Sequence, residues 1–128
     1  MAINFQPVKR RNPLKPNDPE KYYASPVYKD KITLRKIATM IGGQTTISIP
    51  DTMAVLEALT QVLPFFLIDG NIVYLGDFGT FRINLQSEGM PTAEELTSAN
   101  INGFRLLFRA GKEFSKQLKT IETVKVQG

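Results

Sequence analysis

Apolar residues recur at helical spacing in two neighbouring segments near the middle of the chain. In "TLRKIATMI", residues 33–41, they fall every three or four positions, which is typical of a helix with one buried face. Thr33 can cap the start of this helix, and Gly42-Gly43 can end it. The pattern therefore predicts a short amphipathic helix followed by the polar loop "GGQTT".

The second segment, residues 48–70, predicts a longer helix that is apolar on most of its circumference. Ser48 and Asp51 form a capping-box-like pair, and Pro64 removes a backbone donor that should kink or end the helix. One apolar stripe consists of Met53, Leu56, Leu59, Leu63 and Phe66, and a second consists of Ala54, Val55, Ala58 and Val62. Because a chain of 128 residues cannot surround such a helix alone, we expect a partner subunit to cover part of it.

Alternating apolar and polar residues predict strands after the second helix. Residues 72–85, "IVYLGDFGTFRINL", alternate on both sides of an interrupting "GDFG", and residues 101–111 form another predicted strand. One side of that strand consists of Phe104, Leu106 and Phe108, and the other of Arg105, Leu107 and Arg109. Residues 111–124 predict a last helix whose apolar face consists of Phe114, Leu118 and Ile121. The fold class expected from this order is α+β.

The first 30 residues are interpreted as a basic extension of a domain that occupies residues 31–128. "INFQPV" and "YYASPVY" have strand-like composition, but Pro7 and Pro26 confine them to the edges of a sheet. Between them, "RRNPLKPNDPEK" contains three prolines and six charges, so we expect an exposed loop with polyproline character.

The composition excludes several kinds of chemistry. The chain has no cysteine and no histidine, which removes disulfides, thiolate metal sites and the usual general base. The acidic residues Asp51, Glu57, Asp69 and Asp77 have no spacing that suggests a shared site, so we expect no enzyme activity, metal, cofactor or small-molecule substrate. No apolar region suited to a signal peptide begins the chain, and no apolar run approaches the ~20 residues that span a bilayer. We therefore expect a cytoplasmic protein without a membrane partner.

Charge is segregated along the chain. Residues 1–36 carry a net +6 and residues 104–128 a net +4, whereas residues 37–81 carry −4 and residues 82–103 carry −2. Such segregation predicts a positive face that meets a polyanion. The alternative is ordinary surface charge on a mildly basic protein.

The densest motif, "LGDFGTF" at residues 75–81, does not fit a nucleotide site. Its glycines are not spaced as G-x-G-x-x-G or G-x-x-x-x-G-K-[ST], and it does not open a helix. "DFG" matches the magnesium tripeptide of protein kinases, but 128 residues leave no room for that fold. The motif is interpreted as a tight bend in a sheet.

The order of the elements resembles the HU/IHF family of bacterial architectural DNA-binding proteins. The similarity runs from about Ile32 to Ile121 and is strongest in "DGNIVYLGDFGTFRI", residues 69–83, and "FRAGKEFSKQL", residues 108–118. The basic extension resembles that of a divergent HU-like branch in Bacteroides-type bacteria. The resemblance implies two N-terminal helices, a three-stranded antiparallel sheet with a β-arm, a C-terminal helix and an intertwined homodimer. It also implies a nucleoid-associated protein that grips the minor groove of double-stranded DNA and condenses or bends it.

The resemblance also implies roles for individual residues. Phosphate contacts are implied for Arg82, Arg105, Arg109, Lys112 and Lys116, and the alternative for each is a solvated surface charge. The dimer core is expected to contain Leu56, Leu59, Leu63, Phe66, Phe78, Phe81 and Phe108.

The arm departs from the family pattern. Residues 84–102 are a short excursion with three glutamates and no base, whereas the arms of the family are long and rich in arginine. Met90-Pro91 could wedge between base steps, and the alternative is a plain turn at the end of a shortened hairpin.

The extension could compensate for this arm. Lys9, Arg10 and Arg11 precede Asn-Pro, and an Arg-Asn-Pro tip is what the arm of the family carries. We hypothesise that a flexible segment, residues 9–21, takes over backbone binding. The expected function is sequence-tolerant binding of duplex DNA, and the alternative is an HU-like scaffold for protein–protein contacts that binds DNA weakly.

Overall fold

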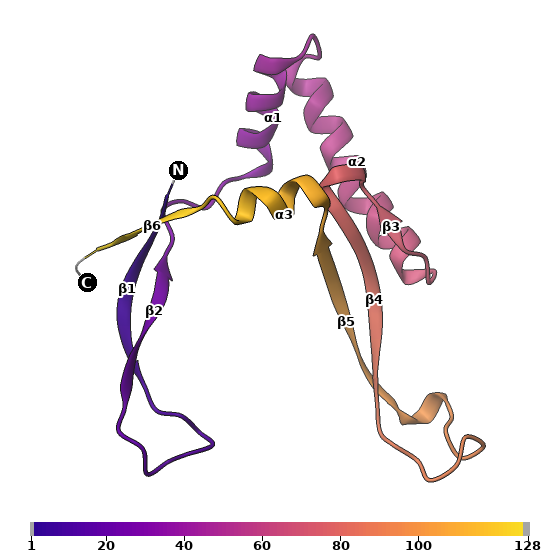
Figure 1. Ribbon diagram of the computed structural model, residues 1–128. Coiled ribbons are helices and arrows are strands. Elements are labelled where there is room, and N and C mark those ends of the chain that lie inside the picture. Colours follow the sequence, from indigo (N-terminus) through magenta and orange to yellow (C-terminus); the bar gives the residue numbers. More distant parts are fainter. Residues whose placement is uncertain (1, 127–128) are drawn as a thin grey trace. The chain divides into compact units, whose positions relative to one another are not determined.

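The computed structural model describes residues 2–126 and shows an α+β chain (Figure 1). In chain order its elements are β1 (Ala2–Arg10), β2 (Lys21–Val27), α1 (Leu34–Gln44), α2 (Ile49–Ile68), β3 (Val73–Tyr74), η1 (Gly76–Phe78), β4 (Gly79–Ser87), η2 (Ser98–Asn100), β5 (Ile101–Ala110), α3 (Lys112–Leu118) and β6 (Glu122–Lys125). The strands form two sheets, with the orders β2-β1-β6 and β3-β4-β5. The predicted α+β class is confirmed, and the strand-like segments of the extension form the first sheet together with β6, a strand that the sequence pattern did not indicate.

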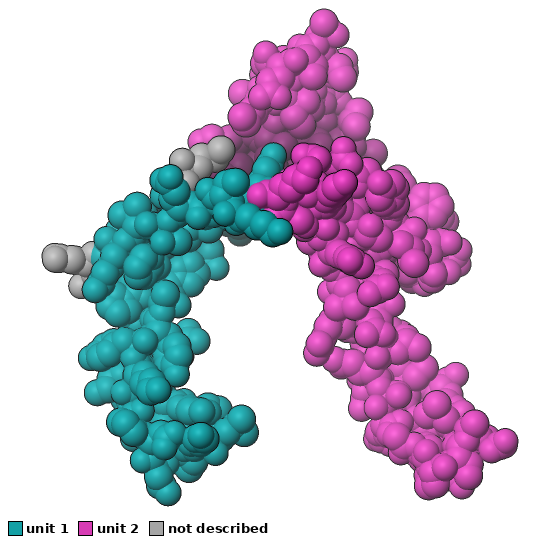
Figure 2. Space-filling view, in the orientation of Figure 1, with its two compact units in different colours: residues 1–31, 117–128 teal, residues 32–116 magenta. Residues whose placement is uncertain are grey.

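Two compact units divide the chain (Figure 2). One comprises residues 1–31 with residues 117–128, and the other comprises residues 32–116. The first unit contains the β2-β1-β6 sheet, and the second contains α1, α2 and the β3-β4-β5 sheet. The domain boundary expected near residue 31 stays a prediction. Contacts between Cα atoms group residues 117–128 with the extension, residues 1–31.

A β-hairpin forms the larger part of the first unit. β1 and β2 pair antiparallel from Asn4 opposite Val27 to Arg10 opposite Lys21. β6 pairs parallel with the beginning of β1, up to Phe5. Pro7 therefore lies where one side of β1 has no neighbouring strand, which is where a sheet tolerates proline. The predicted strands of the extension are present and pair with each other, but only β2 is an edge strand, because β6 makes β1 the middle strand of the sheet.

The last helix is shorter than the sequence pattern predicted. α3 ends at Leu118, and the Thr120 Oγ1 hydroxyl donates a hydrogen bond to the Gln117 carbonyl at 2.8 Å. Residues 122–125 form β6 instead of a further helical turn. The prediction of a helix through residue 124 was wrong because Thr123 and Val124 are β-branched, and pairing with β1 supplies the backbone bonds that a helix would have supplied.

The "GDFG" motif forms the expected bend between β3 and β4. Gly76 has a φ of 56° and Gly79 a φ of 153°, which are conformations that residues with a Cβ rarely adopt. The Leu75 amide donates to the Gly79 carbonyl at 2.9 Å, which closes the turn. A Cβ on Gly79 would also overlap the carbonyl of Arg109 on the neighbouring strand. The two glycines therefore serve the backbone geometry of the sheet.

Four phenylalanines pack together beside this bend. The ring centroid of Phe78 lies 6.3 Å from that of Phe81, 5.2 Å from that of Phe108 and 5.5 Å from that of Phe114. These separations lie in the favourable range for aromatic pairs. Phe78 and Phe108 nevertheless remain exposed in a single chain. The cluster is therefore only partly covered by its own chain.

α1 continues through the two glycines that were expected to end it. It reaches Gln44, and neither Gly42 nor Gly43 has a positive φ. A Cβ on Gly42 would lie 2.9 Å from Ile49 Cγ1 at the start of α2. The prediction of a helix end at Gly42 was wrong, because this glycine lets the chain pass close to α2 and does not form a left-handed cap.

α2 starts at the predicted residue and does not end at Pro64, which was expected to kink or end it. The Asp51 amide donates to Ser48 Oγ at 3.2 Å, as the capping pattern indicated. The helix then runs through Pro64 to Ile68. A proline removes a single bond of the helical ladder, and the side chain of Leu67 is buried one turn later, which stabilises the last turn.

By length and composition, α2 could cross a membrane. It has 20 residues, and the mean hydropathy of its most apolar 18-residue window is 1.4. The expectation that no segment approaches this length is therefore corrected at α2. The core helix of a soluble protein meets the same criterion, and Asp51, Glu57 and Gln61 interrupt the apolar residues of this helix.

One side of α2 is an uncovered apolar surface. Val55, Leu59, Val62 and Phe66, here called the apolar stripe, are all exposed and lie three or four residues apart. Of the expected dimer-core residues, Leu56, Leu63 and Phe81 are half-buried, whereas Leu59, Phe66, Phe78 and Phe108 are exposed. Among residues 2–126, only Ala38 and Leu67 are buried hydrophobic residues. A single copy of the chain therefore leaves most of its apolar side chains in contact with water.

Candidate nucleic-acid interface

Three arginines lie on one face of the β3-β4-β5 sheet. The antiparallel register places Arg105 opposite Asn84 and Arg109 opposite Thr80, and Arg82 lies midway between these two partners on β4. Directly opposite residues, and residues two apart on a strand, share a face. Arg82 is therefore diagonal to both other arginines, and diagonal neighbours on a sheet face are roughly 7–8 Å apart, within reach of long side chains. We call Arg82, Arg105 and Arg109 the basic face.

The basic face is open to solvent and carries no internal counter-charge. All three arginines are exposed, and within residues 2–126 no carboxylate lies within 4.0 Å of their guanidinium groups. A shallow hollow of about 340 Å³ lies on this face and is lined by Ile72, Thr80, Arg82, Leu107, Phe108 and Arg109. Unpaired guanidinium groups around a hollow can donate hydrogen bonds to the oxygens of a phosphate.

The start of α3 places a fourth cation after the same strand. Gly111 joins β5 to α3, its amide donates to the Phe78 carbonyl at 3.0 Å, and a Cβ there would overlap the carbonyl of Asp77. Lys112 is the first residue of α3 and is exposed. Lys116 lies one turn later, where its Nζ is 3.5 Å from Glu113 Oε1. Lys112 is therefore the freer of the two lysines.

The β4–β5 hairpin ends in residues 88–100, here called the acidic tip. The last strand pair joins Ser87 to Ile101, and the Glu88 amide donates to the Asn100 carbonyl at 3.0 Å. The tip contains three glutamates and no lysine or arginine. Met90 and Pro91 lie in this tip, whose sequence contains no cation beside them. Their insertion between base steps stays a prediction, and the negative charge of the tip disfavours it.

The β1–β2 hairpin carries the opposite charge at its end. Lys9 and Arg10 belong to β1, and Arg11 begins the connecting residues 11–20, here called the hairpin tip. Glu20 Oε2 lies 3.6 Å from Lys9 Nζ, and Glu20 Oε1 lies 3.3 Å from Arg11 Nη2. Two of the three predicted DNA-binding residues of the extension therefore share one carboxylate. Arg10 has no ion-pair partner among the residues that the structure describes.

Residues 1–125 match the model of a family described as an HU domain fused to a winged helix-turn-helix, an Ig domain or a glycine-rich motif, HU-HIG. The chain belongs to the HU-HIG family. A solved structure from Bacteroides vulgatus ATCC 8482, described as that of a candidate bacterial DNA-binding protein, is similar to this chain with a TM-score of 0.65 and 11% sequence identity. The similarity covers 98% of this chain and 48% of that one, so this chain spans about half the length of its structural relative. No curated protein matches the chain.

Membership in the HU-HIG family confirms the coarser part of the HU/IHF resemblance. The residues that carried that resemblance run from about residue 32 to residue 121, whereas the family match also includes the β1–β2 hairpin and β6. At 11% identity the structural relative supports the fold alone. The individual contact residues of this HU-HIG chain therefore remain predictions.

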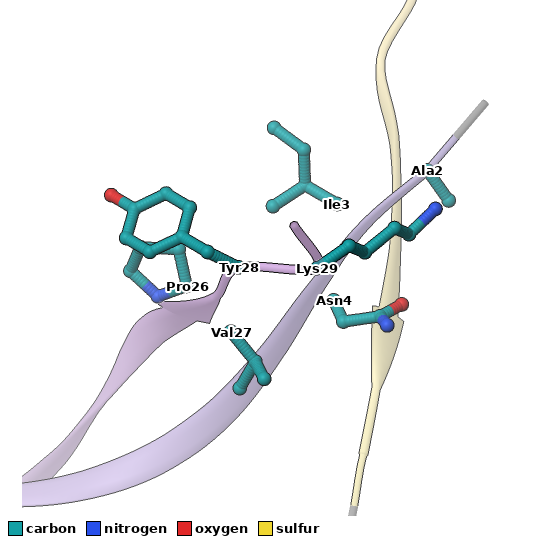
Figure 3. Close-up of a pocket in the computed structure, with 7 residues that line it drawn as sticks. All are labelled: Ala2, Ile3, Asn4, Pro26, Val27, Tyr28 and Lys29. Carbon is teal, nitrogen blue, oxygen red and sulfur yellow. The ribbon is translucent and has the colours of Figure 1, made fainter. Parts of the chain in front are cut away.

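A second hollow lies where the β1–β2 hairpin opens. It has a volume of about 380 Å³ and is lined by Ala2, Ile3, Asn4, Pro26, Val27, Tyr28 and Lys29 (Figure 3). Among the described residues of this lining, Lys29 is the one that carries a charged side chain. None of the described lining residues carries a carboxylate, so they offer mainly apolar surface and no acid–base pair.

Sequence reasoning missed two features of this HU-HIG chain. It did not pair Glu20 with Lys9 and Arg11, because that contact depends on the register of a hairpin whose residues were expected to form a flexible loop. It also missed β6, although the β-branched residues near Val124 were a signal for a strand. The shared sheet face of Arg105 and Arg109 was predicted from alternation and is confirmed.

Proposed function

We propose that this HU-HIG chain is a non-enzymatic, homodimeric protein that binds double-stranded DNA through its phosphates. The observation that carries the proposal is the basic face, where three arginines share one side of a sheet without a carboxylate partner in the described range. Guanidinium groups bind phosphate oxygens in a planar, two-point geometry. Lys112 would add a phosphate contact, and Lys116 a weaker one because Glu113 already attracts it. Phosphate contacts carry no sequence information, so the binding would tolerate many sequences.

The exposed apolar residues of α2 support the homodimer. A soluble chain that leaves the apolar stripe and two rings of its phenylalanine cluster in water gains free energy when another copy covers them. A symmetric dimer also doubles the basic face, because each copy contributes the same three arginines. Six phosphate contacts bind DNA much more tightly than three contacts do.

The biological role that fits this proposal is architectural. A dimeric HU-like protein that holds DNA through phosphates would compact or bend it as a nucleoid-associated protein of the bacterial cytoplasm. The likeness of the extension to Bacteroides-type HU-like proteins belongs to the same proposal. No cofactor, metal or small-molecule substrate enters it.

A salt titration tests the proposal. The dissociation constant for a random-sequence duplex would be measured by fluorescence anisotropy at several salt concentrations, for the native chain and for a variant with Arg82, Arg105 and Arg109 changed to glutamine. The six arginine contacts of a dimer contribute about −5 to the slope of log K against log salt, which corresponds to an affinity loss of about a thousandfold between 50 and 200 mM salt. The variant should lose most of that slope. Micromolar binding by the native chain that does not change with salt would refute DNA binding as its function.

A protein–protein scaffold is the second candidate. The acidic tip, with three glutamates and no base, should be repelled by DNA and favours a basic or polar protein partner. β2 is the end strand of its sheet, and its outer edge could accept an added strand. Salt-insensitive, weak DNA binding in the titration above would support this candidate over the first.

A further inference from the structure

We propose that the β1–β2 hairpin is a second DNA-binding element, in which Leu14 contacts base steps in the minor groove and Arg10, Lys15 and Lys21 contact the flanking phosphates. The proposal rests on the DNA-binding function proposed above, and it adds a site and a mode of contact to it. It also replaces the expectation of a flexible segment at residues 9–21 with a folded hairpin.

Two consecutive turns shape the hairpin tip. The Lys15 amide donates to the Asn12 carbonyl at 3.1 Å, and the Asp18 amide donates to the Lys15 carbonyl at 3.0 Å. Pro13 and Pro16 each occupy the second position of a turn, where the fixed φ of proline is favoured. The Asn12 side chain adds a third restraint, since its Oδ1 accepts from the Leu14 amide at 3.0 Å. The tip is therefore preorganised, and little conformational freedom is lost when it binds.

Leu14 is the apolar residue that these turns present to solvent. It is 89% exposed, the highest value among the exposed large hydrophobic residues of the described chain. It lies between Pro13 and Lys15, at the third position of the first turn. Proteins that bend DNA from the minor groove insert side chains of this kind, such as leucine, methionine or proline, between base steps. The exposure and fixed position of Leu14 therefore suit it to such a contact.

The charge around Leu14 favours DNA over other partners of the tip. Residues 9–21 contain five bases and two acids, a net +3, whereas the acidic tip of the other hairpin carries −3. Arg10 and Lys21 are opposite each other at the end of the strand pairing, and Lys15 lies between the two turns. None of these three has an ion-pair partner among residues 2–126. An apolar residue flanked by free cations fits a groove with phosphates along both walls.

Glu20 pairs with the remaining two cations of the hairpin, Lys9 and Arg11. Its carboxylate is shared by Lys9 and Arg11, so neither is fully available to a phosphate. Both pairs are partly exposed, so they are weak in water and a phosphate could displace them. The proposed contact set is therefore the three unpaired cations.

The first arm of the test separates the hairpin from the overall charge. In the full chain, Arg10, Lys15 and Lys21 are changed to glutamine, and a matched control changes Lys31, Lys36 and Lys119, which alters the net charge equally. If the hairpin binds, its variant should lose about 2–3 units of salt slope for each hairpin that engages DNA, whereas the control should lose less than about one. Equal, small losses in both variants would overturn the proposal.

The second arm tests Leu14 as the wedge. Leu14→Ser and the control Met90→Ser are compared with the native chain in a DNA-bending assay, which follows energy transfer between dyes at the two ends of a short duplex. Leu14→Ser should keep the native salt slope but abolish the increase in energy transfer, and Met90→Ser should keep both. Unchanged bending by Leu14→Ser, or native bending that depends on Met90, would overturn the wedge.

The outcomes also separate this inference from the proposed function. If the native chain binds duplex DNA and the arginine variant of the basic face loses that binding while both hairpin variants retain it, the proposed function stands and the hairpin inference fails. If the native chain fails to bind DNA, both fail.

Discussion

The exposed apolar stripe of α2 leads to a direct test of the dimer. Val55 is 64% exposed in a single chain and makes little contact with its own fold. Complete burial of a valine side chain contributes about 1.5–3 kcal/mol, so the exposed part contributes about 1–2 kcal/mol in each protomer. In a two-fold dimer both copies count, which gives about 2–4 kcal/mol in total.

We therefore expect Val55→Asp to weaken dimerisation strongly. Loss of the apolar contact alone raises the dimer dissociation constant by about 30- to 1,000-fold, since each 1.4 kcal/mol corresponds to a factor of ten. A carboxylate buried without a partner adds a further penalty of about 3–5 kcal/mol per site. Together these effects should leave the variant monomeric at micromolar concentration.

Sedimentation velocity over a range of concentrations measures this change. Gln61→Asp is the matched control, because it adds the same charge to the same helix at an exposed position away from the stripe. If the dimer is needed for folding, Val55→Asp will also lower the melting temperature, and the native melting temperature will rise with concentration. The reasoning is refuted if the native chain is folded and monomeric throughout, or if Val55→Asp associates as the native chain does.

Three further predictions concern other parts of the chain. Glu20→Gln should release the two hairpin cations that pair with Glu20, and so raise the affinity for duplex DNA at low salt. Fluorescence anisotropy should show a salt slope that is steeper by up to about 1.8 per hairpin. An unchanged slope would mean that those cations do not reach phosphates. Gly111→Ala should destabilise the fold by about 1–3 kcal/mol in chemical denaturation, because the new methyl group overlaps the carbonyl of Asp77. The control Gly43→Ala in α1 places a methyl group with no atom within 4 Å and should stabilise the fold by roughly 0.5–1 kcal/mol. Equal effects of the two changes would argue against the packing at the start of α3. Changing the three glutamates of the acidic tip to glutamine should strengthen DNA binding severalfold, because it removes repulsion between like charges. Weaker binding would instead show that these glutamates contribute to DNA binding.

Local chemistry made several features of this fold predictable. The cap at Ser48, the bend in "GDFG" and the shared face of Arg105 and Arg109 each follow from the properties of residues a few positions apart. Helix ends expected from the same local rules are absent at Gly42 and Pro64, where α1 and α2 continue. Packing outweighed local preference at those positions, because continuing a helix through glycine or proline costs less than losing the packing around it.

By itself, the sequence determined the fold class and the alternation that places arginines on one face of a sheet and phenylalanines on the other. It also determined that α2 is too apolar for a single chain to cover. Only the tertiary structure decided that residues 2–27 form a paired hairpin, that β6 joins it, and that Glu20 occupies two of its cations. Periodicity and capping act within a few residues, and a sequence displays them directly. Strand register and ion pairs join residues at distances along the chain that no local pattern encodes. The segment expected to be flexible, residues 9–21, therefore forms the end of a paired hairpin, with Leu14 in a hydrogen-bonded turn at its tip.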